Sequence, residues 1–397
     1  MTTDIHFSER MEGVRPSAIR DLLKLGDDPG LISFGGGYPD PSLFPIQELN
    51  AIYSSLLVPD RSDVLQYTAS NGLPGLRAEV AKRLTRDGMS CTEDDVLIIQ
   101  GAQQGLDLAA KLVVNPGDTV VTENPTFLGA LIAFAPTQPS YAPVRVDEFG
   151  MDTDHLAEVL ADNPNVVMIY TIPEFQNPTG ATMSLERRKH LIELANKYNV
   201  LVVEDSAYRE LRYVGEQLPT IKSLDTEGRV IHLGSFSKIL VPAMRLGWAL
   251  ASPGILDRLA LLKVASDTQN STLNMNATLE YLRRHNIDEH IAKLRPNYLR
   301  KRDLMLSTMR ETFPDEVSFT EPEGGLFTWL TFPVGFDATN FMKETLLPQG
   351  KVAFVPGATF FPVVQEPNHA RVNFSGVEDD RIVEGISRLG NLLKQTL

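Results

Sequence analysis

The chain has 397 residues, of which 43% are hydrophobic and 22% are charged, and its formal net charge at pH 7 is −14. These proportions are ordinary for a folded globular protein and exclude extensive disorder. The acidic balance argues against a nucleic acid as the main partner. The length is too great for a single small core and suits about two or three domains, or one large α/β domain with a smaller one.

The sequence carries no sign of secretion or membrane insertion. Cys91 is the only cysteine, so no intrachain disulfide can form, and a reducing compartment is the natural expectation. The first ten residues lack the basic region and apolar run of a signal peptide, and no apolar stretch is long enough to span a bilayer. We therefore expect a cytoplasmic protein without a membrane partner. The sequence predicts no metal site.

Short β-branched runs alternate with helical patterns in the middle of the chain. The predicted strands lie at 96–99, 119–122, 166–170, 200–203 and 230–233. Amphipathic segments such as 185–198 lie between several of them. This alternation is the signature of a mostly parallel sheet covered by helices, so the predicted fold class is α/β.

The pattern changes after about residue 285. A basic, helix-like stretch at 291–310 leads to a region punctuated by Pro and Gly. Strand-like segments follow at 325–330, 352–355 and 371–374. We predict a large domain over residues 46–284 and a smaller α+β domain over 285–397, which the N-terminal segment 1–45 joins.

Chemically suggestive residues come directly after the predicted strands. Gly101, Asn177, Asp205 and Ser235 each follow a different strand. In sheets of this kind, ligands bind at the carboxyl ends of the strands. The sequence therefore predicts a single site at that edge of the sheet.

The segment Gly-Ser-Phe-Ser-Lys at 234–238 is the strongest chemical signal in the chain. Alone, Lys238 would be a surface charge, but an uncharged lysine amine is a nucleophile that forms Schiff bases. Ser235 and Ser237 offer hydroxyls to a phosphate, and Arg245 can grip two of its oxygens. Backbone N–H groups of Gly101, Ala102 and Gln103, which open a helix-like segment, can also face an anion.

Further residues complete a site for pyridoxal 5'-phosphate (PLP). Asp205 can pair with the pyridine nitrogen and keep it protonated, which makes the ring an electron sink. Tyr208 and Asn177 can donate to the ring's phenolate oxygen, and Phe127 can stack on the ring. Arg371 can clamp a substrate carboxylate bidentately. Each residue alone would be a loop cap, a turn, a core aromatic or a surface charge; their order in the chain favours the PLP site.

Four motifs carry a resemblance to a known family. They are Ser-Phe-Ser-Lys at 235–238, Asn-Pro-Thr-Gly at 177–180, Glu-Asp-Ser-Ala-Tyr-Arg-Glu-Leu at 204–211 and Phe-Val-Pro-Gly-Ala-Thr-Phe-Phe at 354–361. With them, the chain resembles the fold-type I, class I/II aminotransferases from about Ser17 to the C-terminus. The similar subgroup is that of the 2-aminoadipate/kynurenine aminotransferases. The resemblance implies an aspartate aminotransferase-like fold and PLP as cofactor.

The resemblance also assigns roles by position. It implies that Lys238 forms the aldimine with the cofactor and that Tyr67 reaches the phosphate of the other subunit, in a homodimer with shared active sites. The implied cofactor contacts in the same subunit are Gly101, Ala102, Gln103, Phe127, Asn177, Asp205, Tyr208, Ser235, Ser237 and Arg245. The implied substrate contacts are Arg371 for the α-carboxylate, Gly36, Gly37 and Asn177 in the pocket, and Arg20 for a distal carboxylate.

Two positions depart from the family pattern. Ala102 stands where Ser is usual, which removes a hydroxyl but leaves the backbone N–H groups. Glu174 stands beside the Asn177 turn where a neutral residue is common. We expect an extra carboxylate there to disfavour acidic substrates.

The resemblance implies a ping-pong transamination between an L-amino acid and a 2-oxo acid, with 2-oxoglutarate as acceptor. The amino donor is acidic, such as 2-aminoadipate, or aromatic or aliphatic. One alternative is another PLP reaction on the same fold, such as decarboxylation, racemisation or a lyase reaction, which needs the same cofactor residues. The other is a non-catalytic effector-sensing domain, as in transcription regulators that carry a basic helix-turn-helix domain ahead of the resemblance; only a short segment precedes it here.

Overall fold

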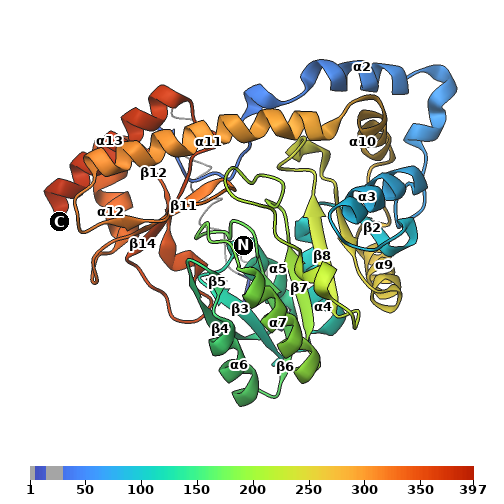
Figure 1. Ribbon diagram of the computed structural model, residues 1–397, viewed down its shortest axis with the longest axis horizontal. Coiled ribbons are helices and arrows are strands. Elements are labelled where there is room, and N and C mark those ends of the chain that lie inside the picture. The colour runs from blue at the N-terminus through green and yellow to red at the C-terminus, as the bar shows by residue number, and fades with distance from the viewer. Residues whose placement is uncertain (1–4, 15–29) are drawn as a thin grey trace.

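The computed structural model describes residues 5–14 and 30–397 (Figure 1). The residue predicted to bind a distal carboxylate, Arg20, therefore lies outside the described residues. Within the described part of the chain, no helix is both long enough and apolar enough to cross a lipid bilayer.

The largest sheet among the described residues has eight strands. In chain order they are β2 (Val96–Ile99), β3 (Thr119–Asn124), β4 (Ser140–Asp147), β5 (Gly150–Met151), β6 (Val166–Thr171), β7 (Leu201–Asp205), β8 (Val230–Ser235) and β9 (Gly247–Leu250). In space their order is β2-β9-β8-β7-β6-β3-β4-β5. β8, β7, β6, β3 and β4 run parallel, whereas β9 is antiparallel to both of its neighbours. The predicted α/β fold class with a mostly parallel sheet is confirmed.

Helices cover both faces of this sheet (Figure 1). The helices of this part of the chain are α2 (Ile46–Leu56), α3 (Pro74–Arg86), α4 (Ala102–Val113), α5 (Leu128–Phe134), α6 (Thr153–Asp162), α7 (Leu185–Tyr198), α8 (Ile221–Leu224), α9 (Pro253–Asp267) and α10 (Thr272–Arg284), of which α2 packs against α10. Met168 and Val203 belong to the apolar cluster that contains α4, whereas Ile169 and Val202 belong to the cluster that contains α6 and α7. Successive strand residues point to opposite faces. Because both faces are buried, the strands read as continuous apolar runs.

A second, antiparallel sheet lies in the C-terminal part of the chain. It pairs β10 (Ser318–Phe319), β11 (Phe327–Thr331), β14 (His369–Asn373) and β13 (Val355–Pro356) in that order. The long helix α11 (Ile287–Thr312) packs against α13 (Asp379–Thr396), and α12 (Ala338–Phe341) lies nearby (Figure 1). The remaining short helices are η1 (Glu9–Met11), η2 (Pro41–Leu43), η3 (Pro59–Leu65), η4 (Glu93–Asp95), η5 (Ala135–Thr137), η6 (Pro242–Met244), η7 (Met342–Gly350) and η8 (Gly357–Phe360).

The N-terminal segment pairs with this C-terminal part. β1 (Ile32–Ser33) runs parallel to β12 (Val352–Ala353). The prediction of one strand at 352–355 is wrong, because β12 bonds to β1 whereas β13 bonds to β14 in the antiparallel sheet. The domain limits proposed after residues 45 and 284 stay predictions.

Candidate active site

Four of the predicted site residues lie at one edge of the large sheet. Asp205 and Ser235 are the last residues of β7 and β8, Gly101 closely follows β2, and Asn177 lies in the loop after β6. These four strands point in the same direction, so their carboxyl ends meet at this edge. The structure therefore brings the four residues to the place where α/β sheets bind ligands.

Lys238 lies in the turn after β8. Its Nζ donates a hydrogen bond to the carbonyl oxygen of Gly37 at 2.7 Å and lies 6.0 Å from the centre of the Tyr208 ring. Burial, followed by the positive charges of Arg371 and Arg245, lowers the pKa of Lys238 from 10.5 to about 8. The amine is therefore partly neutral close to physiological pH, and the neutral form is the nucleophile.

Asp205 ends β7 with one unpaired carboxylate oxygen. Oδ2 accepts a hydrogen bond from the hydroxyl of Tyr170 at 3.2 Å, whereas Oδ1 is buried without a hydrogen-bond partner among the described residues. Burial raises the pKa of Asp205 to about 6, although the bonds from Tyr170 and the Ala207 N–H oppose the rise. A buried acceptor without a donor costs free energy. Oδ1 is therefore a candidate acceptor for an N–H group of a ligand.

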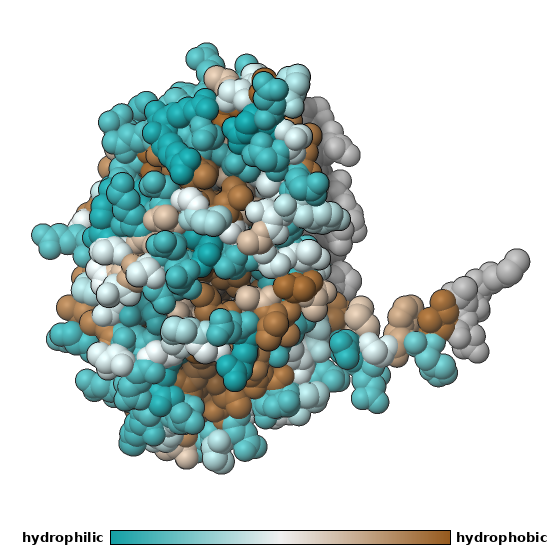
Figure 2. Space-filling view, turned by 90° about the vertical axis from the view of Figure 1, so that its right-hand side faces the viewer, coloured by the Kyte–Doolittle hydropathy of each residue, from teal (hydrophilic) through white to brown (hydrophobic). Residues whose placement is uncertain are grey.

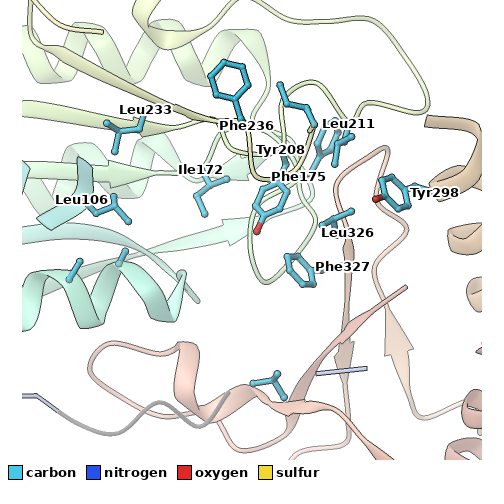
Figure 3. Close-up of a cluster of buried hydrophobic side chains, with 14 of the residues drawn as sticks. Leu106, Ile172, Phe175, Tyr208, Leu211, Leu233, Phe236, Tyr298, Leu326 and Phe327 are labelled. Atoms are coloured by element: carbon cyan, nitrogen blue, oxygen red, sulfur yellow. The ribbon is translucent and has the colours of Figure 1, made fainter. Parts of the chain in front are cut away.

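Asn177 stands between Tyr208 and Arg371. Its Nδ2 donates to the Tyr208 hydroxyl at 3.4 Å, and its Oδ1 accepts from Nη1 of Arg371 at 2.9 Å. Figure 3 shows Tyr208 and Phe327 among the buried side chains near this point, and their rings meet edge to face at 5.8 Å. The loops after β6 and β7 and the strand β14 therefore contribute to one polar centre.

Arg371, on β14, is a buried cation without an acidic partner among the described residues. It is 2% exposed and donates from Nη2 to the carbonyl oxygen of Gly35 at 2.8 Å, while its Nε has no partner there. Its guanidinium stacks on Phe327 and Phe360, at 4.2 and 5.1 Å from their ring centres. Burial lowers the pKa of Arg371 to about 10. A buried, uncompensated guanidinium is an anion site, and its planar fork matches a carboxylate.

The N-terminal segment that contains Gly36 and Gly37 runs between these two cations. The Gly37 carbonyl accepts from Lys238, and the Gly35 carbonyl accepts from Arg371. A Cβ on Gly37 would come within 2.9 Å of a phenylalanine ring. The backbone therefore approaches the site closely only because a side chain is missing there.

The residues predicted to hold a phosphate surround the start of α4. Gly101 caps this helix with a φ of 73°, and a Cβ there would come within 3.0 Å of Nη2 of Arg245. That Nη2 donates to the carbonyl oxygen of Gln100 at 3.1 Å, which holds the guanidinium beside the helix start. The first N–H groups of a helix, here those of Ala102 and Gln103, lack intrahelical partners and favour an anion.

The two serines lie next to this helix start. The Oγ of Ser235 accepts from the N–H of Ser237 at 3.1 Å, and both residues are buried. Gly247 pairs with Ser235 in the sheet, and a Cβ on Gly247 would come within 3.0 Å of Gly101. Hydroxyls, a guanidinium and backbone donors therefore meet in one small region.

Phe127 and Tyr67 are placed very differently. Phe127 precedes α5, and a Cβ on Gly129 would come within 2.3 Å of its ring. The side chain of Gln103 donates to the Gly129 carbonyl at 2.7 Å, so Phe127 lies near the start of α4, where a phosphate is predicted to bind. Tyr67 is 81% exposed, and its hydroxyl makes no hydrogen bond within the described part of the chain.

Buried polar residues that the sequence analysis did not single out brace the turn after β6. The Nε2 of Gln176 donates to Glu123 at 3.0 Å, and its Oε1 accepts from the N–H of Thr179 at 2.8 Å. Glu123 also accepts from the hydroxyl of Thr171 at 2.6 Å, and burial raises the pKa of Glu123 to about 7. A polar residue that ends an apolar run was the available signal for both Glu123 and Tyr170.

The packing of Glu174 removes the reason given for expecting it to disfavour acidic substrates, which stays an untested prediction. Its carboxylate is 1% exposed and forms ion pairs with Arg188 at 2.6 Å and with Arg209 at 2.5 Å. Burial opposes its ionisation, but the two arginines outweigh burial and lower the pKa of Glu174 to about 2. Two cations therefore compensate this charge, which leaves no free carboxylate to repel a substrate.

The groups at this edge fit PLP. The phosphate of this cofactor needs several converging donors, which Ser235, Ser237 and Arg245 offer together with the start of α4. The pyridine nitrogen needs an acidic acceptor, which the unpaired Oδ1 of Asp205 provides. The aldehyde needs an amine that is partly neutral near physiological pH, which the lowered pKa of Lys238 provides.

Comparisons with known proteins agree with this geometry. The model of the family "Aminotransferase class I and II" matches residues 45–389. An aromatic-amino-acid aminotransferase of Thermococcus litoralis is 40% identical over 99% of this chain and 95% of that protein. A 2-aminoadipate transaminase of Thermus thermophilus is 37% identical over 97% of this chain and 95% of that protein.

A solved structure agrees as well. The kynurenine aminotransferase of Pyrococcus horikoshii superimposes with a TM-score of 0.92 at 39% identity, over 98% of this chain and 97% of that one. The resemblance seen in the sequence, the fold type and PLP as cofactor are thereby confirmed. The chain belongs to the class I and II aminotransferases and is a PLP-dependent aminotransferase.

Proposed function

We propose that the protein transfers the amino group of an L-amino acid to 2-oxoglutarate in a ping-pong reaction. The donors are aromatic or aliphatic amino acids and acidic ones such as 2-aminoadipate. The buried Arg371 carries this proposal, because donor and acceptor both hold a carboxylate next to the reacting carbon. Similar proteins are named for aromatic amino acids, 2-aminoadipate and kynurenine, which supports this donor range.

The cofactor residues divide into three groups in this proposal. PLP, when bound, supplies a conjugated ring that accepts the electron pair of the bond broken at the substrate Cα. Asp205 keeps the ring nitrogen protonated, and Asn177 and Tyr208 donate to the phenolate oxygen. The phosphate is held by Ser235, Ser237, Arg245 and the N–H groups of Gly101, Ala102 and Gln103, with Phe127 stacked on the ring.

Lys238 has two tasks. Its neutral amine binds the cofactor aldehyde in the resting protein, which the lowered pKa permits. With PLP and substrate bound, the free Nζ would take the proton from the substrate Cα as a general base. The carbonyl of Gly37, which accepts from Nζ, keeps the amine near this position.

Arg371 orients the substrate for this proton transfer. The stacked rings of Phe327 and Phe360 hold the guanidinium plane, so the carboxylate meets a fixed fork. A fixed carboxylate in turn fixes the direction of the Cα–H bond relative to Lys238. The same fork binds the 2-oxo acid, so a single site serves both halves of the reaction.

We also propose a homodimer with shared active sites. Large apolar side chains are exposed in and around η3 and on α9, among them Leu57, Leu65 and Leu261. Figure 2 views the molecule from the side of α3, α9 and α10 and shows hydrophobic residues gathered among polar ones. Exposed apolar patches of this kind mark interaction sites. Tyr67 lies close to Leu65 in the chain, so a partner that covers this surface would receive the Tyr67 hydroxyl.

A donor panel tests the proposed substrate range. Purified protein with PLP and 2-oxoglutarate is given L-2-aminoadipate, kynurenine, phenylalanine, leucine or alanine singly, and the glutamate formed is measured. We expect turnover with acidic, aromatic and aliphatic donors. In the variant Arg20→Ala, kcat/KM for 2-aminoadipate should fall while that for phenylalanine stays. Turnover without glutamate formation would reject the acceptor, and an equal fall for both donors would reject the role of Arg20.

A further inference from the structure

A charge-balanced cluster of four side chains, three of them buried, joins the two loops that carry Asn177 and Tyr208. Glu174 pairs with Arg188 at 2.6 Å and with Arg209 at 2.5 Å. Arg209 also grips Asp87 with two bonds, of 2.6 and 2.9 Å. We call this group the Glu174–Arg209 cluster.

One arginine of the cluster closes the base of the Asn177 loop. Arg188 donates from Nη2 to the carbonyl of Pro173 at 3.1 Å and from Nε to the carbonyl of Met183 at 3.0 Å. These two carbonyls lie at the two ends of the loop. Within it, the N–H of Gln176 donates to the carbonyl of Ala181 at 2.8 Å. The loop is therefore a closed unit whose shape is set from its base.

The other arginine joins this loop to its neighbour. Glu174 precedes Asn177 in the loop after β6, and Arg209 directly follows Tyr208 in the turn after β7. The two loops also meet at Asn177 and Tyr208, but Asn177 Nδ2 and the Tyr208 hydroxyl are 3.4 Å apart, which is long for a hydrogen bond. The shorter ion pair between Glu174 and Arg209 is therefore the stronger contact between the two loops.

Folding stability alone gives a poor reason for burying these charges. Replacing a buried ion pair by apolar side chains is often neutral or stabilising, because desolvation opposes the attraction of the charges. What an ion pair with fixed hydrogen bonds supplies, and an apolar contact does not, is a defined distance and direction.

We propose that the ion pair between Glu174 and Arg209 is a positioning device, which holds Tyr208 against Asn177 so that both donors face the same oxygen of the cofactor. This inference rests on the proposed roles of Asn177 and Tyr208. Glu174 and Arg209 are positioning residues, because they act through these two donors.

The variant Arg209→Met tests the proposal. It leaves Glu174 in a neutral pair with Arg188, and the partly exposed Asp87 can be hydrated, so no buried charge is left uncompensated. We expect the dissociation constant of PLP from the variant to rise by about tenfold or more, since small misplacements weaken precise contacts strongly. The pH midpoint of the visible absorbance band of the bound cofactor should also shift, because phenolate donors set it.

Arg77→Met is the matched control. Arg77 is 7% exposed, against 4% for Arg209; it forms an ion pair with Asp94 at 3.0 Å and donates to a backbone carbonyl, whereas Arg209 pairs with two carboxylates. It lies on α3 away from both loops. We expect a loss of melting temperature similar to that of the Arg209 variant, with unchanged PLP affinity and pH midpoint.

The results distinguish a failure of the positioning proposal from a failure of the roles proposed for Asn177 and Tyr208. Wild-type PLP affinity and midpoint in Arg209→Met, or the same changes in Arg77→Met, would overturn the positioning role. If Arg209→Met does not fold, Arg209→Lys keeps the charge but cannot hold two carboxylates at once; wild-type values there would overturn the proposal equally. A wild-type protein whose cofactor band does not titrate would instead reject the proposed roles of Asn177 and Tyr208.

Discussion

Nη1 of Arg371 donates to Oδ1 of Asn177 at 2.9 Å, and this bond joins the C-terminal sheet to the large sheet at the active site. Asn177 also faces Tyr208 through its amide nitrogen. One asparagine therefore connects a residue proposed to bind the substrate with a residue proposed to bind the cofactor. We therefore expect a substitution of Arg371 to affect both the residue proposed to bind the substrate and the residues proposed to bind the cofactor.

The first prediction concerns the substrate carboxylate. Arg371→Met should lower kcat/KM for every amino acid by the equivalent of about 2–5 kcal/mol, the usual cost of removing one partner of a buried charge pair. The kcat/KM of Arg371→Lys should lie between the values of the wild type and of Arg371→Met, because an ammonium group keeps the charge but cannot form two parallel hydrogen bonds to a carboxylate. Steady-state kinetics on two donors measures both variants.

Arg212→Met is the matched control for this experiment. Arg212 is also buried and also stacks on a ring, that of Phe175 at 4.9 Å, but it pairs with Glu323. Its loss should lower stability and leave KM unchanged. An Arg371 variant with wild-type KM for all donors would contradict the assignment.

The second prediction concerns the ring nitrogen. Asp205→Asn removes the negative charge that keeps the nitrogen protonated, and a neighbouring charge shifts a pKa by about 1–3 units, so turnover should fall by about 10–1000-fold. Since burial raises the pKa of Asp205 to about 6, its ionisation costs folding free energy as pH rises through 6. The cofactor-free variant should therefore be as stable as the wild type at pH 7 or more so. A variant that keeps full activity contradicts the role of Asp205.

The third prediction uses the pH dependence of stability in cofactor-free protein. The folded state lowers the pKa of Lys238 from 10.5 to about 8, so it favours the neutral amine. The charged amine therefore costs stability below pH 8, and this cost disappears as pH rises from 8 to 10.5. Lys238→Met should stabilise the cofactor-free protein by up to about 3 kcal/mol at pH 7 and by little near pH 10.5. Urea titrations at several pH values measure the difference, and a pH-independent difference would contradict it.

The fourth prediction tests the shared sites. Lys238→Ala and Tyr67→Ala should each be nearly inactive alone, because each lacks a residue that its own or its partner's site needs. In a hybrid dimer, the site with an intact Lys238 receives Tyr67 from the other subunit. Mixing both variants under conditions of subunit exchange should therefore restore activity to about a quarter of the wild type, as expected for random pairing in a two-fold dimer. If Tyr67 served its own subunit, mixing would restore nothing.

Much of the large sheet could be predicted because each of its buried strands is visible in the sequence as a short apolar run. Runs such as 96–99 and 230–233 are apolar since both of their faces are buried, and their polar neighbours lie where strands end. β9 was not predicted, because Gly247–Leu250 is short and closely follows Arg245, the arginine proposed to bind the phosphate. The single strand predicted at 352–355 failed because a run of residues does not show that its two halves bond to different sheets.

The candidate site likewise has residues that local sequence signals reveal and contacts that only the fold creates. Lys238, Asp205 and Ser235 could be found because each follows a strand with a side chain suited to PLP. The neutralisation of Glu174 could not be found, since Arg188 and Arg209 come from a helix and a loop that only the fold brings to it. The sequence shows that Glu174 carries a negative charge, but only the folded structure shows which cations pair with it.

Transamination through Lys238 can be followed in the visible absorbance spectrum of the purified protein with PLP, recorded before and after adding a single amino acid. We expect that the band of the lysine-bound cofactor disappears with 2-aminoadipate or phenylalanine, that a 2-oxo acid forms in equal amount, and that 2-oxoglutarate restores the band. In Lys238→Ala the first band should be absent. Release of carbon dioxide, ammonia or the inverted amino acid in place of the 2-oxo acid, or no band in the wild-type protein, would contradict transamination through Lys238.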